Sequence, residues 1–379
     1  MSQPPTSPVS AADRPVLLLT CGDPAGIGPE IIWLAWATTP AHARARLRVV
    51  GDATLLAATI RGRRGLPPLR ITPIAADDPR ASVCDELLVI DTATPGAAAE
   101  EIPLATITAA GGRAAATAVL TAHELAKRGL ARAIITGPLH KEALHAAGYD
   151  VPGHTELLAR ACGLPADAAS MMLWLPSQAA GTIPSLPLRA SMSQAAGNDA
   201  DRSAGLGVVH VTLHEPLRTA IARLSTPGIV AAGERLAALL APLLGRPPRI
   251  ALAALNPHGG EGGLFGDEEA RLVVPAVAAL RAAGLDATGP LPADTLFLRA
   301  SRGEFDGVVA LYHDQGHIPI KLLGMHRAVN ITLGLPLVRT SVAHGTGFDI
   351  VGTGAADPAS MLAAIDAAER LVHAGWLSP

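Results

Sequence analysis

Three apolar, β-favouring segments of this sequence each end in a histidine, and together they point to a metal site. The segments are residues 208–214 (VVHVTLH), 250–258 (IALAALNPH) and 308–313 (VVALYH). Ligands of open α/β sheets bind outside the carboxyl ends of the strands, so residues far apart in the sequence can converge there. His214, His258 and His313 would together suit a catalytic divalent metal that keeps an open coordination position.

Two of these histidines lie in glycine-rich, polar sequence. His258 belongs to residues 256–263 (NPHGGEGG), and His313 belongs to residues 312–316 (YHDQG). A single histidine after a strand is more often an ordinary turn or capping residue than a metal ligand. Glycine-rich sequence, however, lets a backbone approach a ligand closely. The three histidines are therefore interpreted as a set.

Two further turns have the composition of anion sites. Residues 21–30 (CGDPAGIGPE) lead into a predicted helix whose unpaired amides would face a ligand. Their spacing is neither that of a P-loop nor that of a dinucleotide fingerprint, so this turn by itself is a weak indication. Residues 153–156 (GHTE) open a second helical pattern, in which Thr155 is predicted to cap the helix while the first amides bind an anion such as phosphate. A plain cap without a ligand is the alternative.

Three cationic or polar side chains further along the chain could complete such an anion site, namely Lys321, Asn330 and Arg339. Arg339 could hold a carboxylate or a phosphate through two parallel hydrogen bonds, unless it is an ordinary surface arginine.

The elements that must position these residues alternate between strand and helix, which predicts an α/β fold. Strands are expected near residues 15–20, 47–50, 87–90, 133–136, 171–175, 308–311, 329–333 and 337–340. Helices are expected near residues 114–127, 216–224, 229–244, 267–283 and 359–373. Residues 176–207 break this rhythm with Ser, Gly, Pro, Asn and Asp, and we interpret them as an inserted surface loop.

Bulk composition favours a small-molecule partner. The formal net charge of -3 and the aromatic content of 3% argue against a nucleic-acid surface. No run approaches the roughly 18 apolar residues of a membrane span, and residues 1–14 are predicted to be a disordered tail rather than a signal peptide. Cys21, Cys84 and Cys162 show no CxxC spacing, so we expect structural thiols in a reducing cytoplasm.

Six motifs in order along the chain closely resemble the 4-hydroxythreonine-4-phosphate dehydrogenase (PdxA) family. They are residues 22–30 (GDPAGIGPE), 153–156 (GHTE), 256–258 (NPH), 289–295 (GPLPADT), 312–316 (YHDQG) and 329–336 (VNITLGLP). The resemblance runs from about residue 16 to the C-terminus and is highly specific as a set.

The resemblance implies an isocitrate/isopropylmalate-dehydrogenase-like fold of two α/β domains, with the active site in the cleft between them. Residues 15–135 with 336–379 would form the cofactor-side domain, and residues 136–335 the metal, substrate and dimerisation domain. It further implies a homodimer with shared active sites, NAD or NADP, and one divalent ion such as Zn, Mg or Co in each site.

The site residues follow from the same resemblance, position by position. The metal ligands would be His214, His258 and His313, with one of them supplied by the partner subunit. The substrate-binding set would be His154, Thr155, Lys321, Asn330 and Arg339. Residues 344–350 (HGTGFDI) resemble the loop that holds the adenosine half of the cofactor, through His344, Gly345, Thr346 and Asp349, with Gly347 standing where alanine is usual.

The implied reaction agrees with the residue types. Oxidation of a secondary alcohol beside a carboxylate-bearing carbon requires loss of the hydroxyl proton as hydride leaves, and a divalent metal favours both this step and the loss of CO2 that follows. Lys321, eight residues after His313, is the candidate for handling the proton. His313 is the other residue expected to take part in catalysis.

The substrate stays open among three branches of the family. Residues 289–295 favour the vitamin B6 branch, which acts on 4-phosphooxy-L-threonine and forms a phosphorylated ketone for pyridoxal phosphate synthesis. Residues 141–145 (KEALH) and 316–323 (GHIPIKLL) look more like the catabolic branch, which oxidises 4-phospho-D-threonate or 4-phospho-D-erythronate. A third branch oxidises aromatic cis-dihydrodiol dicarboxylates, but the retained His154 and Thr155 favour a phosphate.

Two other classes of protein are weighed against a dehydrogenase. One is a phosphometabolite-binding protein that has lost turnover, and the other is a phosphoryl- or acyl-transfer enzyme on a related fold. Candidate metal, phosphate and cofactor residues in one chain argue against both. The insertion at 176–207 could reshape the pocket, but we expect it to decorate the surface, because long surface insertions cost little.

Overall fold

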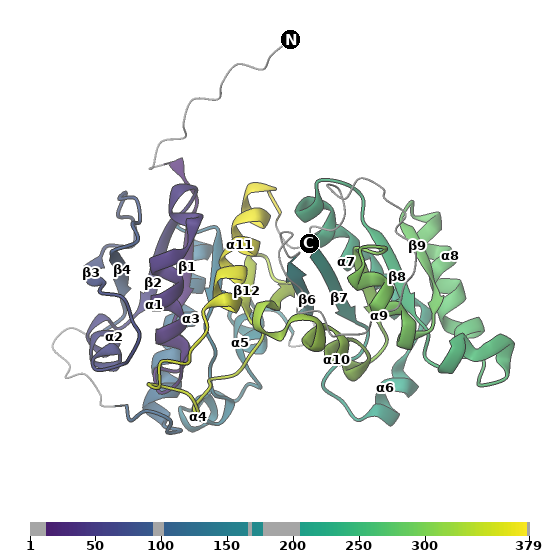
Figure 1. Ribbon diagram of the computed structural model, residues 1–379, viewed down its shortest axis with the longest axis horizontal. Coiled ribbons are helices and arrows are strands. Elements are labelled where there is room, and N and C mark those ends of the chain that lie inside the picture. The colour runs from purple at the N-terminus through teal and green to yellow at the C-terminus, as the bar shows by residue number, and fades with distance from the viewer. Residues whose placement is uncertain (1–12, 94–101, 166–168, 177–204, 377–379) are drawn as a thin grey trace, which may run out of the picture. The chain divides into compact units, whose positions relative to one another are not determined.

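The computed structural model describes residues 13–93, 102–165, 169–176 and 205–376 (Figure 1). The chain forms two compact units. The first comprises Met1–Met171 with Val329–Pro379, and the second comprises Met172–Ala328. The α/β class predicted from the sequence is confirmed. The boundaries of the units differ from those expected, because residues 136–171 and 329–335 belong to the first unit.

The sheet of the first unit has the strand order β3-β4-β2-β1-β5-β12-β11. Neighbouring strands run parallel, except that β11 and β12 are antiparallel. The strands are β1 (Val16–Thr20), β2 (Arg46–Gly51), β3 (Arg70–Ile74), β4 (Glu86–Asp91), β5 (Ala133–Thr136), β11 (Val329–Leu333) and β12 (Val338–Val342). Central strands such as β1 and β5 are buried throughout, as expected for a parallel sheet covered on both faces.

Helices flank this sheet (Figure 1). They are α1 (Gly28–Thr38), α2 (Ala53–Ile60), α3 (Ala109–Lys127), α4 (Lys141–Ala146), α5 (His154–Ala161) and α11 (Ala359–His373), with a short 3-10 turn at Pro40–Ala43. Side chains cap two of these α-helices, since Asp52 accepts a hydrogen bond from Leu55 N and Thr108 accepts one from Gly111 N. Small residues let α3 approach α4 closely: a Cβ on Gly112 would lie 1.9 Å from Ala143 O.

The strand order of the first unit reverses at β1. From β1 the chain passes through α1 to β2 on one side, whereas from β4 it passes through α3 to β5 on the other side. The backbones that follow β1 and β5 touch, because Asp23 N donates to Pro138 O at 2.9 Å and Gly22 has a φ of 70°. Open α/β sheets bind ligands at such a reversal, outside the carboxyl ends of the strands.

The second unit contains strands in the order β6-β7-β10-β8-β9, where all but the first two residues of β6 belong to this unit. They are β6 (Ser170–Pro176), β7 (Gly205–His210), β8 (Arg249–Ala253), β9 (Asp286–Leu291) and β10 (Gly307–Ala310), and β6 alone among these described strands is antiparallel to its neighbour. The strands β7, β10 and β8, which precede the three candidate metal histidines, are adjacent and parallel. Their carboxyl ends therefore share one edge, as the sequence predicted.

The helices of the second unit are α6 (Leu217–Arg223), α7 (Thr226–Leu244), α8 (Val274–Ala282), α9 (Ala293–Ser301) and α10 (His313–Gly324). A π-helical turn, Glu269–Val273, runs directly into α8, and 3-10 turns span Pro257–Gly263 and Met325–Arg327. Glycines in β7 and β10 make room for α7, since a Cβ on Gly207 or Gly307 would lie 3.0 or 2.7 Å from Leu240.

By length and composition, α7 could cross a membrane, and it is the one such helix in the part of the chain that the structure describes. The sequence predicts a helix near residues 229–244 but no membrane span, because Glu234 and Arg235 interrupt its apolar run. Ile229, Leu236 and Leu240 are buried, and α7 packs against β7, β10 and α8. It is a core helix of the second unit.

Several expected boundaries were wrong. The predicted insertion at 176–207 is too long at both ends, since Pro176 ends β6 and residues 205–207 begin β7. Residues 177–204, and residues 1–12 of the predicted tail, lie outside the described residues. The elements α2, β3, α4, β9, α9 and α10 were not predicted.

Candidate active site

Arg339 is the centre of a buried polar cluster in the first unit. Its side chain projects from β12 and donates to Thr332 Oγ1 of β11 at 2.8 Å and to Thr136 Oγ1 of β5 at 2.7 Å. A longer contact of 3.4 Å reaches Thr155 Oγ1 of α5. The residue is 3% exposed, so it is not the ordinary surface arginine considered above. The two threonines on β5 and β11 were not predicted.

The charge of Arg339 is poorly compensated. Burial lowers the pKa of its guanidinium to about 10, and the carboxylate of Glu156 has a smaller, opposing effect on it. Its partners in the described residues are hydroxyls, none of which carries a negative charge, and its Nε has no hydrogen-bond partner there. A buried cation with free donor capacity favours an anionic ligand.

Two neighbouring side chains of the first unit also keep unused hydrogen-bonding capacity. His154 Nε2 is buried without a partner among the described residues, and burial, followed by the charge of Arg339, lowers the pKa of this imidazole well below its usual range. Asn330 donates to Val342 O at 3.2 Å, while its Oδ1 has no described partner. Buried polar atoms are normally paired, so these atoms mark a place where a ligand can bind.

The prediction that Thr155 caps the next helix was wrong. The capping position is Gly153, and α5 begins at His154, which makes Thr155 the second helical residue. With no side-chain cap, the first amides of α5 keep their donor capacity, and the positive end of the helix dipole adds to the field of Arg339.

His214 and His313, two of the three candidate metal ligands, lie together in the second unit. His214 follows β7 by four residues, and His313 is the first residue of α10. Their ring centroids are 5.8 Å apart, close to the roughly 5 Å expected for two imidazoles on one tetrahedral ion. His313 Nδ1 lies 2.7 Å from the Asp314 carboxylate, which accepts its proton and leaves Nε2 free for a metal. This donor pair fits a divalent ion such as zinc.

His258 does not join this pair within one chain. Its ring contacts Phe265 at 6.0 Å, and its Nδ1 lies 3.4 Å from Glu261 Oε2. Residues 258–262 adopt left-handed backbone conformations, which explains the glycines at this place. Among the described residues, no group of three potential ligands could hold a metal ion. The expectation that a partner subunit supplies one ligand stays a prediction.

Two histidines that were not predicted as site residues complete the cluster. The His317 ring stacks on the His313 ring, with centroids 3.8 Å apart and an interplanar angle of 10°. His317 Nδ1 lies 3.1 Å from Nε2 of His210, the last residue of β7. Burial lowers the pKa of both imidazoles, that of His317 to about 4, so the pair is neutral. The signal for His317 was its position one helical turn after His313.

Lys321 lies on the same face of α10 as these rings. His313, His317 and Lys321 are spaced four residues apart, which places them one above another along the helix. Lys321 is exposed, and its charge is one of the influences on the His317 imidazole. The structure thus assigns Lys321 to the second unit and Asn330 and Arg339 to the first.

The candidate cofactor loop follows β12 and packs on the turn after β1. Ile27 N donates to Thr346 O at 2.8 Å, and Glu30 of α1 accepts from Gly352 N at 2.7 Å. Gly347 has a φ of 57°, which explains glycine at this position. His344 contacts only the neighbouring Gly345 O among the hydrogen bonds of the described residues, and Asp349 is exposed.

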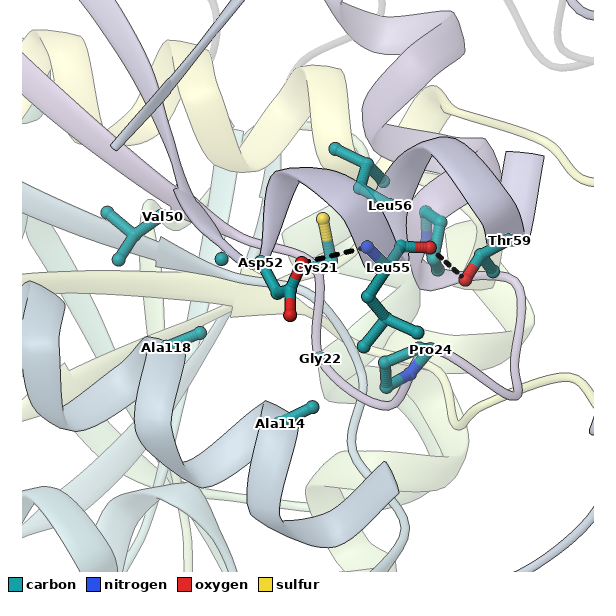
Figure 2. Close-up of a pocket in the computed structure, with 12 residues that line it drawn as sticks. Cys21, Gly22, Pro24, Val50, Asp52, Leu55, Leu56, Thr59, Ala114 and Ala118 are labelled. Atoms are coloured by element: carbon teal, nitrogen blue, oxygen red, sulfur yellow. Dashed lines mark hydrogen bonds between the residues drawn. The ribbon is translucent and has the colours of Figure 1, made fainter. Parts of the chain in front are cut away.

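A small apolar cavity lies beside the same turn, between β2, α2 and α3 of the first unit (Figure 2). Its volume of about 30 Å³ holds roughly one or two water molecules, so it is not a substrate pocket. Cys21 lines it, and burial raises the pKa of that thiol to about 12. Cys21 is therefore no thiolate nucleophile, in agreement with the structural role predicted for it.

The fold and these side chains define an α/β protein with a buried cationic cluster in one unit and a histidine cluster in the other. Residues 43–368 match the sequence model of the family described as pyridoxal phosphate biosynthetic protein PdxA. The chain belongs to this family, as its motifs predicted.

Named relatives cover almost the whole chain. A 4-hydroxythreonine-4-phosphate dehydrogenase from Beijerinckia indica is 44% identical over 95% of this chain and 95% of its own length. A D-threonate 4-phosphate dehydrogenase from Cupriavidus necator is 43% identical over 93% of this chain and 95% of its own. The crystal structure of 4-hydroxythreonine-4-phosphate dehydrogenase from Klebsiella pneumoniae is similar with a TM-score of 0.76 and 39% identity, over 96% of this chain and 99% of that chain.

Proposed function

We propose that this protein is an NAD(P)-dependent dehydrogenase that oxidises the secondary alcohol of a 4-phosphorylated hydroxy acid and then releases CO2. The observation that carries the proposal is the buried guanidinium of Arg339, which has free donor capacity and no described ion pair. A terminal phosphate would supply the missing negative charge. Family membership and the names of the relatives support the same class of substrate.

The phosphate is proposed to bind in the first unit. Arg339 would donate to it, Thr155 and the open amides at the start of α5 would add further donors, and His154 would use its free Nε2. Asn330 would hold a neighbouring polar group through its unused Oδ1. Because the imidazole of His154 is neutral, it can donate one hydrogen bond without adding a second buried charge.

The metal is proposed to be held by His214 and His313, with His258 contributed by a second copy of the chain. When bound, a divalent ion acts as a Lewis acid toward the substrate hydroxyl and the carbonyl that replaces it. Lys321 would take up the hydroxyl proton while hydride passes to the nicotinamide, so that an alcohol and NAD(P)+ become a ketone, NAD(P)H and a proton. His344, Gly345, Thr346 and Asp349 would bind the adenosine half of the cofactor.

A homodimer is part of this proposal, since the described residues of one chain bring together two of the three candidate metal ligands, His214 and His313. Several apolar side chains on α6 and on α10 of the second unit are exposed: Leu217, Ile221, Ile318, Leu322 and Leu323. Leu322 is 83% exposed. A second subunit would cover these side chains. Free thiols at Cys21, Cys84 and Cys162 fit a cytoplasmic location.

The particular substrate is proposed from two branches of the family, which together offer three acids. The relatives named for 4-hydroxythreonine-4-phosphate and for D-threonate 4-phosphate are 44% and 43% identical, which favours neither. Purified protein is therefore incubated with Zn2+, Mg2+ or Co2+, NAD+ or NADP+, and either 4-phosphooxy-L-threonine, 4-phospho-D-threonate or 4-phospho-D-erythronate. Formation of reduced nicotinamide with one acid assigns the substrate. No turnover with any of them, in protein that binds metal, refutes the dehydrogenase proposal.

A further inference from the structure

One flat face of the His313 ring is covered by another imidazole. The rings of His313 and His317 are nearly parallel, with centroids 3.8 Å apart. Two rings stacked in this way direct their nitrogen lone pairs along parallel planes, so both cannot bind the same ion. His317 is therefore not a further ligand of the proposed metal site. Its ring instead limits how far the His313 ring can tilt.

The stacked ring is itself held in place. His317 Nδ1 and His210 Nε2 are 3.1 Å apart, so one nitrogen donates to the other. Both residues are buried, and His210 comes from the end of β7 whereas His317 comes from α10. The hydrogen bond thus ties the helix that carries His313 to the strand that precedes His214.

Gly316 makes room for this pair. A Cβ at position 316 would lie 2.4 Å from His210 Nε2, 2.8 Å from Val208 Cγ1 and 3.0 Å from Ala310 Cβ. Any larger residue would push against the same nitrogen that bonds His317. The glycine therefore lets the His210 ring lie against α10.

Two restraints then act on the His313 ring from different directions. The Asp314 carboxylate fixes the edge that carries Nδ1, and His317 covers the face. Fixing a ligand before the ion arrives lowers the entropy lost on binding, and partners of this kind commonly contribute 10- to 100-fold to metal affinity.

We propose that His317 and His210 are positioning residues, a hydrogen-bonded pair that orients His313 for a divalent ion. This inference rests on the proposed metal site. It assigns a role to two histidines that bind neither metal nor substrate, and it predicts that their loss weakens binding of the metal even when no substrate or nicotinamide is present.

The test measures binding of Zn2+ or Co2+ alone to the full chain by calorimetric titration, with the visible absorption of bound Co2+ as a report of ligand geometry. Four variants separate the effect of the ring stack from the effect of the hydrogen bond. His317→Ala removes the stack and the hydrogen bond, His317→Phe keeps a flat ring, His317→Gln keeps a hydrogen-bonding group, and His210→Ala leaves His317 without its partner. His326→Ala, an exposed histidine just beyond α10, is the matched control.

We expect His317→Ala to weaken metal binding about 10- to 100-fold and to change the Co2+ spectrum, with smaller losses in the Phe and Gln variants. His326→Ala should bind like the native chain. Circular dichroism and thermal unfolding check the fold, and the Phe and Gln variants carry the test if the alanine variant does not fold.

The outcomes separate the two proposals. If the native chain binds metal and all folded variants bind it equally well with the same spectrum, the positioning role is wrong while the metal site stands. If the native chain binds neither ion at its histidines, the proposed metal site fails and this inference fails with it.

Discussion

Replacing Arg339 with methionine should make the protein without ligand slightly more stable while abolishing its response to phosphate. Burial lowers the pKa of Arg339 from its ordinary 12.5 to about 10, so enclosure disfavours its protonated form by about 3 kcal/mol. A lowered pKa in a base means that this cost is present at every pH below about 10. The guanidinium is thus charged, and costly, under assay conditions.

The substitution also removes favourable contacts. Arg339 donates short hydrogen bonds to Thr332 and Thr136, each worth about 1 kcal/mol. The burial cost that the substitution removes exceeds the loss of these two hydrogen bonds by about 1 kcal/mol. Arg339→Met should therefore be about 1 kcal/mol more stable than the native chain, which raises Tm by roughly 2–4 °C. At a phosphate concentration of 100 times Kd, binding should raise the free energy of unfolding of the native protein by about 2.7 kcal/mol. This corresponds to an increase in Tm of roughly 5–10 °C.

The assay is thermal unfolding with increasing inorganic phosphate, at fixed pH and constant ionic strength. Arg128→Met, which removes an exposed arginine at the end of α3, controls for lost positive charge and should keep the native response. The reasoning is refuted if Arg339→Met still shifts with phosphate as the native chain does. It is equally refuted if this variant melts several degrees lower without phosphate, because the arginine would then be a structural residue.

Three other measurements test the fold and the site. Glu30→Gln leaves the buried Arg63 guanidinium without its ion pair of 2.9 Å, so urea unfolding should show a loss of about 3–5 kcal/mol; an unchanged midpoint would contradict the buried pair. Contacts with Arg246 and Arg249 hold the pKa of the Asp306 carboxyl below its ordinary 3.8. The stability that the Asp306 carboxylate confers is therefore complete above about pH 3.8 and decreases as the pH falls below 3.8. Asp306→Asn should therefore flatten the acid side of the stability-pH profile, and a profile equal to that of the native chain would exclude this role. Dialysis against a chelator should abolish turnover, and added Zn2+, Mg2+ or Co2+ should restore it; full activity in the chelated protein would exclude the metal.

Hydrophobic pattern was sufficient for the continuous, buried elements. The strands β5 and β11 and the helix α11 have the bounds that the sequence predicted, because each is a clean apolar or amphipathic run between turn residues. The helix α10 was missed because Gly316 and Pro319 interrupt it. In addition, the apolar Leu322 lies on its exposed side, so the helix lacks a clear amphipathic pattern. The strand β9 was missed for a similar reason, as it contains Gly289 and Pro290.

The site could be predicted only where a local motif or the family resemblance marked it. Arg339 was selected, but its hydroxyl partner Thr136 is 203 residues away in the sequence, and no local pattern relates the two. His210 resembles any residue of a buried strand until the sheet places it beside α10. Contacts of this kind depend on strand order, which periodicity does not determine.

The order of strands also governs when each unit can fold during synthesis. In the first unit β12 lies between β5 and β11, so an interior strand comes from the last part of the chain. A ribosome that has made only the first 171 residues exposes the edge of β5 without its neighbour, whereas the whole second unit is complete before β11 emerges. The second unit can therefore fold co-translationally, while the first must wait for the last strands, with its open edge available to chaperones in the interval.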